Sequence, residues 1–283
     1  MLGPEERKHI LRWAYIPEHL PDYVTAVTGM EPFLFRNHVF YRRGDILVFV
    51  GYPLEGVFTD ADLGECLVEA TGAFRPGTIS LIAPRLPDWK RPAQRGKEDA
   101  YYRIDLRTLH PRSKVRNMTR RASTEVACEK GGHLGEEHIR LIRDFIAMRK
   151  LEEGTRLILE RVPDYVNSVP TAVVFSARER SGRLAGFTVA EYGAKDYGFY
   201  MFNFRSGECG VPGVSDLLLH EAMQTALAEG KTFMNLGLGI REGVAFFKKK
   251  WGAKHFLDYE TCTYRLSSRQ LLGRILGFMG RRT

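Results

Sequence analysis

The chain has 283 residues, 44% of them hydrophobic and 27% charged, and these proportions are ordinary for a folded protein with a buried core. Its longest apolar run, Ile46–Val50, is far shorter than the roughly 20 residues of a membrane-spanning helix, and the first residues lack the basic-then-apolar order of a signal peptide, so we expect a cytoplasmic protein. The formal net charge of +8 predicts attraction to polyanions, namely nucleic acid, phosphorylated substrates or acidic lipid head groups.

In chain order, the first third of the sequence predicts a helical start, then strands and one strong helix. Residues 5–30 have a helical pattern that is interrupted near Pro17 and Pro21. Thr59 is expected to cap a helix over 59–72. Strands are expected over 32–41, 45–52, 78–83 and 101–106.

The rest of the sequence repeats this order on a larger scale. Helices are expected over 113–124, 136–150, 215–229 and 241–251, and strands over 171–177, 184–192, 197–204, 232–236 and 256–264. Paired strands, a helix and a further strand therefore occur around 32–83 and again around 171–236. This order predicts an α/β (α+β) protein with a mixed central sheet.

Metal and redox chemistry find no support in the sequence. The four cysteines lie far from one another along the chain, and the eight histidines are scattered. Neither set has the spacing of a metal site or a redox pair. We therefore expect no metal ion and no permanently bound cofactor.

The segment from Gly213 to Ala253 carries a resemblance to a known family. A loop opens a helix, a strand follows, and a second helix ends in the turn Phe247-Lys248-Lys249-Lys250-Trp251-Gly252. This arrangement resembles the acyl-donor half of the GNAT-like acyltransferases, and the form of the turn is closer to the Fem-type (FemAB-like) aminoacyltransferases. The basic stretch Ser113–Ala122 is similar to the helix that opens the second lobe in those enzymes.

The resemblance implies tandem GNAT-like lobes, each with a mixed central sheet flanked by helices. The N-terminal lobe is expected over 1–109, and the C-terminal lobe with the acyl-transfer cleft over 110–265. Residues 266–283 form a basic tail, and the apolar and arginine positions over 268–283 predict an amphipathic helix. This helix could contact an anionic membrane surface or dock on the protein itself.

The resemblance also implies a site for the acyl donor around the start of the helix over 215–229. Unpaired amides at such a helix start suit a phosphate or a carboxylate, although a glycine-rich stretch is also an ordinary connection. The glycines stand at every third position, unlike the usual acyl-CoA loop, so acyl-CoA and aminoacyl-tRNA both remain open as donors. The candidate donor-binding residues are Gly207, Gly210, Gly213, Ser215, Asn235 and Phe247.

Four residues are candidates for catalysis. The resemblance places Lys248 at the cleft, where a lysine can hold a phosphate or stabilise a developing oxyanion. Tyr200 and Asn203 lie on the strand over 197–204, which corresponds to the splayed strand of the family, and Glu191 lies near it. The helix over 241–251 is expected to bury a face that contains Ile240, Val244, Phe247 and Trp251, with Lys249 and Lys250 pointing to water.

The basic helix offers a candidate site for a substrate phosphate. Arg116 and Arg120 are four residues apart, so on a helix they lie one above the other and repel each other. A bound anion would relieve this repulsion, and a phosphate on the substrate or on RNA could provide it. The alternative is an ordinary solvated helix face.

The sequence and the resemblance together predict an acyltransferase or aminoacyltransferase. It would move an acyl group from acyl-CoA or aminoacyl-tRNA to an amine acceptor, either a small molecule or a larger precursor. We expect no stable DNA partner, and peripheral membrane contact would come through residues 268–283. The rival hypothesis is a non-catalytic nucleic-acid-binding or scaffold protein on the same fold, because a fold alone does not fix a function.

Overall fold

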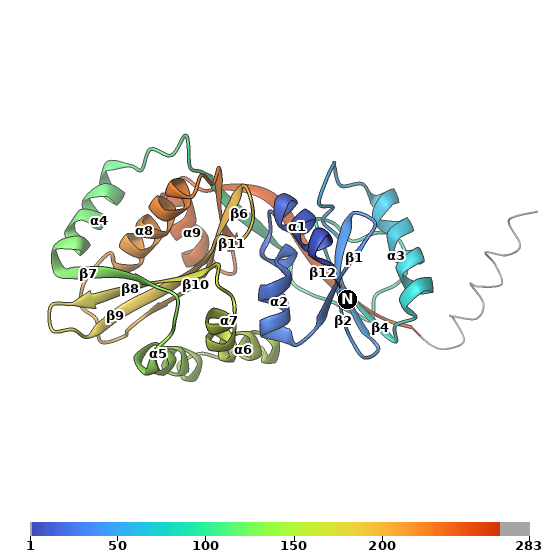
Figure 1. Cartoon of the computed structure of the whole chain (residues 1–283), viewed down its shortest axis with the longest axis horizontal. Helices are drawn as coiled ribbons and strands as arrows, with labels where there is room; N and C mark the ends of the chain where they lie inside the picture. Colours follow the sequence, from blue (N-terminus) through green and yellow to red (C-terminus); the bar gives the residue numbers. More distant parts are fainter. Residues whose placement is uncertain (1, 267–283) are drawn as a thin grey trace, which may run out of the picture. The chain divides into compact units, whose positions relative to one another are not determined.

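The computed structural model describes residues 2–266, so the predicted amphipathic helix over 268–283 lies outside the described residues. Contacts within the chain group it into two compact units (Figure 1). Unit 1 contains the residues up to Ile10, those from Met30 to Ala100 and those from Leu257 onward, and unit 2 contains Leu11–Gly29 and Tyr101–Phe256. The predicted lobes are continuous segments, whereas each observed unit combines segments that are far apart in the sequence.

Unit 1 contains a mixed sheet with the strand order β1-β2-β3-β4-β12. Three antiparallel strands come first, and β4 then runs parallel to β3 and antiparallel to β12. Helix α3 (Asp60–Phe74) connects β3 to β4, and α1 (Pro4–Trp13) begins in this unit. The strands are β1 (Glu31–Phe35), β2 (His38–Arg43), β3 (Ile46–Val50), β4 (Thr78–Ala83) and β12 (Lys254–Arg265), and the short β5 (Gln94–Arg95) pairs with β12.

Helix α3 forms where the sequence predicts it. The Thr59 hydroxyl accepts a hydrogen bond from the backbone N–H of Asp62 at 3.2 Å and so caps the first turn. Leu63, Leu67 and Ala70 recur at helical spacing and are buried in the core of unit 1. Burial of this apolar stripe holds the helix on the sheet.

The predicted strand over 32–41 is wrong, because the chain turns in the middle of it. Arg36 has a left-handed backbone with a φ of 51°, and the two strands β1 and β2 pair directly across Arg36 and Asn37. Tight hairpins usually carry glycine at such a position. An arginine there left no signal of a turn in the sequence.

Unit 2 contains a second mixed sheet, with the order β6-β11-β10-β9-β8-β7. All neighbouring strands are antiparallel except β10 and β11, which are parallel and are connected by helix α8 (Val214–Ala228). The strands are β6 (Asp99–Asp105), β7 (Val126–Gly131), β8 (Ala172–Glu179), β9 (Leu184–Glu191), β10 (Tyr197–Arg205) and β11 (Phe233–Leu238).

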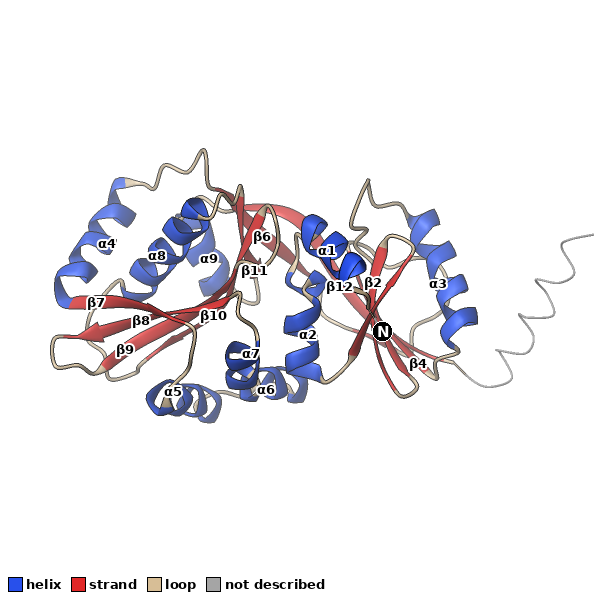
Figure 2. Cartoon of the chain, in the orientation of Figure 1, coloured by secondary structure: helices blue, strands red, loops and turns tan. Residues whose placement is uncertain are grey.

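Two sets of helices cover opposite faces of this sheet (Figure 2). Helices α4 (Ser113–Glu125) and α8 share one hydrophobic core with the sheet. On the other face, the sheet shares a core with α5 (Glu136–Ala147), α6 (Glu153–Glu160) and α7 (Val162–Ser168). The remaining helices are η1 (Pro17–His19), α2 (Pro21–Thr28) and α9 (Glu242–Lys250). The predicted helices of this half are confirmed, whereas β7, α6 and α7 were not predicted.

The predicted buried face of α9 is only partly correct. Trp251 is buried, and Val244 and Phe247 are half-buried. Ile240, however, is 74% exposed, because it precedes the helix and has a left-handed φ of 59°. Helical spacing therefore does not apply to Ile240.

Candidate functional site

The parallel pairing of strands β10 and β11 in unit 2 ends part-way along both strands. They pair in parallel at only three positions, from Tyr197↔Phe233 to Phe199↔Asn235. Strand β10 then continues to Arg205 and β11 to Leu238 without further pairing between these two described strands. Backbone groups on the facing edges beyond this point are therefore released from the sheet ladder, as a carbonyl-binding site requires. We call this feature the β10–β11 opening.

A β-bulge at Met201 decides which side chains of β10 share a face. The register with β9 shifts between Tyr200 and Phe202, so one extra residue is inserted there. Tyr200 and Asn203 would point to opposite faces of a regular strand, because side chains alternate. With the bulge, the Tyr200 hydroxyl donates to Asn203 Oδ1 at 2.9 Å, and Asn203 Nδ2 donates to Ser215 Oγ at 3.1 Å.

The structure therefore brings three sequence-predicted residues together, namely Tyr200, Asn203 and Ser215. Two come from β10 and the third from the first turn of α8. Burial raises the pKa of Tyr200 well above its usual range, and the nearby Asp216 carboxylate raises it further. The phenol carries its proton at neutral pH, as it would at its ordinary pKa, and acts as a hydrogen-bond donor to Asn203.

Gly213 starts helix α8 and fits closely against α4. Its φ is 83°, and a side-chain carbon added there would stand 2.7 Å from Met118 Cγ. No side chain caps this helix start, so its first amides have no capping acceptor from the Gly213 position. Of the three predicted glycines, Gly213 is thus required by geometry, whereas Gly207 and Gly210 are exposed in an open loop.

Asp216 joins the start of α8 to the end of α9. Its carboxylate is 5% exposed and accepts hydrogen bonds from Lys250 Nζ and from Trp251 Nε1, each at 2.8 Å. The prediction that Lys250 points largely to water is wrong, because this buried carboxylate holds its ammonium group. Lys249 is exposed, as predicted. The Lys250 contact also offsets the negative charge that Asp216 brings to the helix start.

Lys248 is buried at the far end of β11. It is 4% exposed, and its Nζ donates to the carbonyl oxygen of Leu238. Asn235 is fully buried, and its side chain accepts from Gly237 N and donates to the carbonyl of Tyr15, both at 2.7 Å. Both side chains therefore fix the part of β11 that borders the β10–β11 opening. Phe247 packs, half-buried, against the core below α8.

Glu191 does not join the other catalytic candidates. Its carboxylate accepts from the Tyr165 hydroxyl at 2.6 Å and from Gly193 N at 3.0 Å. Tyr165 belongs to α7, which covers the face of the sheet opposite α8. Burial raises the pKa of Glu191. The structure thus separates Glu191 from the group formed by Tyr200, Asn203 and Ser215.

The two arginines of the basic helix are exposed and bonded within their own neighbourhood. Arg116 Nη1 donates to the carbonyl of Pro111 at 2.7 Å. Arg120 Nη2 lies 3.5 Å from Asn117 Oδ1, which is a weak contact. Their predicted role in binding a substrate phosphate remains a prediction.

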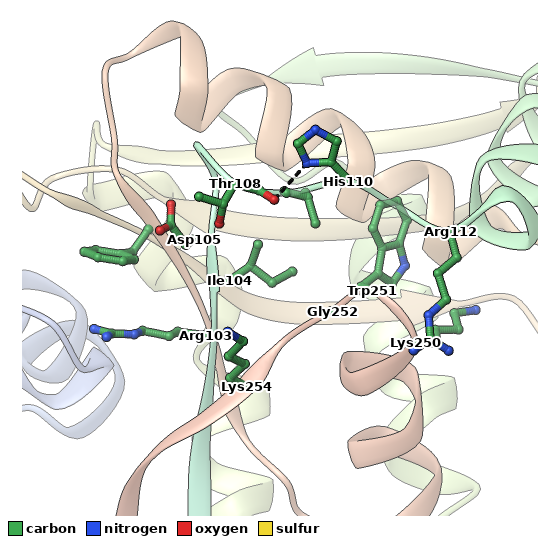
Figure 3. Close-up of a pocket in the computed structure, with 12 residues that line it drawn as sticks. Arg103, Ile104, Asp105, Thr108, His110, Arg112, Lys250, Trp251, Gly252 and Lys254 are labelled. Atoms are coloured by element: carbon green, nitrogen blue, oxygen red, sulfur yellow. Dashed lines mark hydrogen bonds between the residues drawn. The ribbon is translucent and has the colours of Figure 1, made fainter.

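A cation-lined pocket in unit 2 was not predicted. We call it the basic pocket, and Arg103, Arg112, Lys250 and Lys254 contribute its positive charges (Figure 3). These residues come from β6, the loop before α4, the end of α9 and the start of β12. Arg112 and Lys250 belong to basic runs in the sequence, whereas Arg103 and Lys254 do not, so no local pattern could have indicated the whole set.

Residues 2–266 contain neither a metal site nor a membrane-spanning helix. No group of His, Cys, Asp and Glu side chains in this range could hold a metal ion. Within the same range, no helix combines the length and the apolar character needed to cross a membrane.

Comparisons with known proteins establish the fold. No family profile matches the sequence, and no curated protein matches it at a significant level. Among solved structures, FemX is 11% identical, with 98% of each chain covered and a TM-score of 0.60. L-PGS from Bacillus licheniformis is 14% identical, with 99% of this chain and 98% of that chain covered and a TM-score of 0.59.

A third similar structure is the C-terminal DUF2156 domain of a proposed lysylphosphatidylglycerol synthetase from Agrobacterium fabrum. It is 13% identical, covers 97% of this chain and 95% of its own, and has a TM-score of 0.61. These whole-chain similarities confirm the prediction of a GNAT-like fold of the Fem type. At such low identities they show the fold alone.

Proposed function

We propose that the protein is an acyltransferase that moves an acyl or aminoacyl group from a carrier to an amine acceptor. The carrier would be acyl-CoA or aminoacyl-tRNA, used as a co-substrate. The observation that carries this proposal is the β10–β11 opening, next to the uncapped start of α8 and the hydrogen-bonded Tyr200, Asn203 and Ser215. The fold, which is similar to that of FemX and L-PGS, supports the same reaction class.

The reaction needs an electrophilic carbonyl, a stabilised oxyanion and a protonated leaving group. The amine nitrogen attacks the carbonyl carbon of the thioester or ester, and the carbonyl oxygen becomes negative. Backbone N–H groups on the released edge of β10 would donate to this oxygen. The carbon–sulfur or carbon–oxygen bond then breaks, the leaving group takes up a proton, and the amine loses one.

Tyr200 suits the role of proton donor to the leaving group. The phenol is protonated at neutral pH, and its hydrogen bond to Asn203 Oδ1 holds the hydroxyl in place, so that a leaving group could replace Asn203 as the acceptor. General acid catalysis by a positioned side chain typically contributes about 100-fold or more to a rate. The proton lost by the amine would pass to solvent or to a group of the acceptor.

Lys248 and the start of α8 would stabilise the negative charges of the oxyanion and of the donor phosphate. The Lys248 ammonium lies at the end of β11, bonded to Leu238 O, where a positive charge lowers the energy of a nearby oxyanion or phosphate. The free amides at the start of α8 suit a phosphate of the donor. The ion pair between Lys250 and Asp216 offsets the carboxylate charge that would otherwise repel an anion at this helix start.

A donor screen tests the proposal. The purified protein is titrated with acetyl-CoA and with a pool of aminoacyl-tRNAs, and transfer of a labelled acyl group to added amines is followed. We expect saturable binding of one carrier and transfer that depends on Tyr200. Binding of any RNA with an affinity that grows with length and falls steeply with salt, without saturable donor binding or transfer, would instead support the nucleic-acid-binding rival.

A further inference from the structure

The basic pocket lies wholly within unit 2 and has a volume of about 400 Å³. We propose that it binds a ligand that carries a phosphate ester and that contacts Arg112 and Lys254. The proposal does not depend on acyl transfer, because it concerns binding at residues that the transfer mechanism does not use.

The charges of the pocket favour an anion. Its lining contains four cationic side chains and one carboxylate, that of Asp105. Lys250 is committed to Asp216, so two acidic groups balance two of the four positive charges. Arg112 and Lys254 are exposed, and neither forms an ion pair with another residue in the part of the chain that the structure describes. A phosphate ester, with one or two negative charges, matches this excess.

Arg103 is held in a fixed orientation at the pocket wall. Its guanidinium stacks between the rings of Phe233 and Phe256, with centroid distances of 4.4 Å and 4.8 Å. One of its N–H groups donates to the Tyr197 hydroxyl at 2.6 Å, and in Figure 3 its side chain extends away from Arg112. Arg103 therefore adds positive charge to the lining without being aimed at the same point as Arg112.

His110 adds a further polar group to the lining. Its Nδ1 lies 2.9 Å from the carbonyl oxygen of Thr108, and since a carbonyl only accepts, Nδ1 carries the proton (Figure 3). The other ring nitrogen, Nε2, then points away from this hydrogen bond. In the view of Figure 3, Arg112 and Lys250 are seen toward one end of the pocket, and Arg103 and Lys254 toward the other.

The volume of the basic pocket indicates a ligand larger than a bare phosphate ion. Pockets for small organic ligands typically measure about 300–1,000 Å³, and this pocket lies within that range. A soluble phosphorylated metabolite and the head group of a phospholipid share the required chemistry. The experiment below separates these two sources.

Binding is measured by calorimetry on the full chain, without any acyl donor, with glycerol 3-phosphate and inorganic pyrophosphate as probes and glycerol as the neutral control. Cosedimentation with vesicles of phosphatidylcholine, with and without phosphatidylglycerol, tests the lipid source. We expect at least one phosphate probe to bind, and Arg112→Gln and Lys254→Gln each to weaken it about tenfold. Lys249→Gln, an exposed neighbour on α9 outside the pocket lining, should leave binding unchanged.

The outcomes are distinct. Binding of soluble probes alone assigns a phosphorylated metabolite, and binding of anionic vesicles alone assigns a lipid head group. The proposal is overturned if no phosphate probe or vesicle binds, or if Lys249→Gln weakens binding as much as Arg112→Gln. It is also overturned if Arg116→Gln or Arg120→Gln weakens binding while the Arg112 and Lys254 variants do not. None of these results depends on whether acyl transfer is observed.

Discussion

Units 1 and 2 contain the same local order of strand, helix and parallel strand, but they join the two strands differently. In unit 1, β3 and β4 pair at five successive positions, and the N–H of Gly51 extends the ladder to the carbonyl of Ile82. In unit 2, β10 and β11 pair at three positions and then separate. Within the residues that the structure describes, β10 and β11 of unit 2 therefore have unpaired backbone groups on their facing edges, at the point where β3 and β4 of unit 1 remain paired.

The helices that follow β3 and β10 also begin differently. Thr59 caps α3, and the acidic residues Asp60 and Asp62 stand in its first turn. The start of α8 has no side-chain cap, and its acidic residue, Asp216, is paired with Lys250. The acidic first turn of α3 therefore disfavours an anion, whereas the start of α8 is electrostatically better suited to one. This difference supports our proposal that the donor site lies in unit 2, although both units share one pattern.

The largest expected effect is a loss of acyl transfer when one hydroxyl is removed from unit 2. Removal of one hydroxyl from unit 1 is the control. Tyr200→Phe in unit 2 should lower acyl transfer about 100-fold, because it removes the proposed proton donor. Tyr52→Phe in unit 1 removes a hydroxyl that donates to Asp258 O at 2.6 Å. It should cost about 1 kcal/mol of stability and leave transfer unchanged. Single-turnover rates per folded protein provide the measurement, and equal losses in both variants would contradict the assignment of chemistry to unit 2.

A smaller effect is expected at the end of β11. Lys248→Met keeps the length of the buried side chain but removes its charge and its hydrogen bond to Leu238 O. We expect turnover to fall about 30-fold, which corresponds to about 2 kcal/mol of lost transition-state stabilisation. Lys249→Met is the matched control, because Lys249 is exposed, and it should retain the parental rate. If the two variants lose activity equally, Lys248 does not act at the opening.

Substitutions at the starts of α8 and α3 should both lower stability, but only the substitution in α8 should weaken donor binding. Gly213→Ala places a carbon 2.7 Å from Met118 Cγ at a φ of 83°, so we expect a loss of about 2 kcal/mol and weaker donor binding. Thr59→Ala removes the cap of α3 and should cost about 1 kcal/mol without changing donor binding. Urea unfolding and donor titration measure both quantities. Weaker donor binding in Thr59→Ala would contradict the assignment of donor binding to the start of α8.

The smallest expected effect is a pH dependence that arises in unit 1. Burial lowers the pKa of His38 to about 4, with Asp62 opposing the shift and Arg36 adding to it. The unfolded chain binds the proton more tightly, so this stability is present above about pH 6.5 and is lost as the pH falls toward 4. We expect the free energy of unfolding to fall by about 1–2 kcal/mol between pH 7 and pH 5 from this group.

His38→Phe should remove that part of the pH dependence, as measured by urea unfolding at several pH values. His133→Ala, at an exposed histidine of unit 2, should keep it. A parental pH profile in His38→Phe would show that other groups cause the effect.

The sequence by itself determined most of the elements and the fold class. Apolar spacing in α3 and α8 and the cap at Thr59 are local signals, and both helices formed within a few residues of their predicted positions. The resemblance over Gly213–Ala253 led to the correct fold, because the loop, helix, strand and aromatic turn are continuous in the sequence. Where the local signal was weak, as at Arg36 and in α6 and α7, the prediction failed.

Only the tertiary structure decided the site. The bulge at Met201 places Tyr200 and Asn203 on one face, and periodicity alone would have separated them. The pairing of Lys250 with Asp216 depends on two helices meeting, and the sequence favoured a solvated lysine instead. The basic pocket gathers residues from three separate regions of the sequence, over 103–112, at Phe233 and over 250–254. Local patterns report which face of an element is buried, whereas the partners of a polar side chain are set by packing between elements, which no local pattern contains.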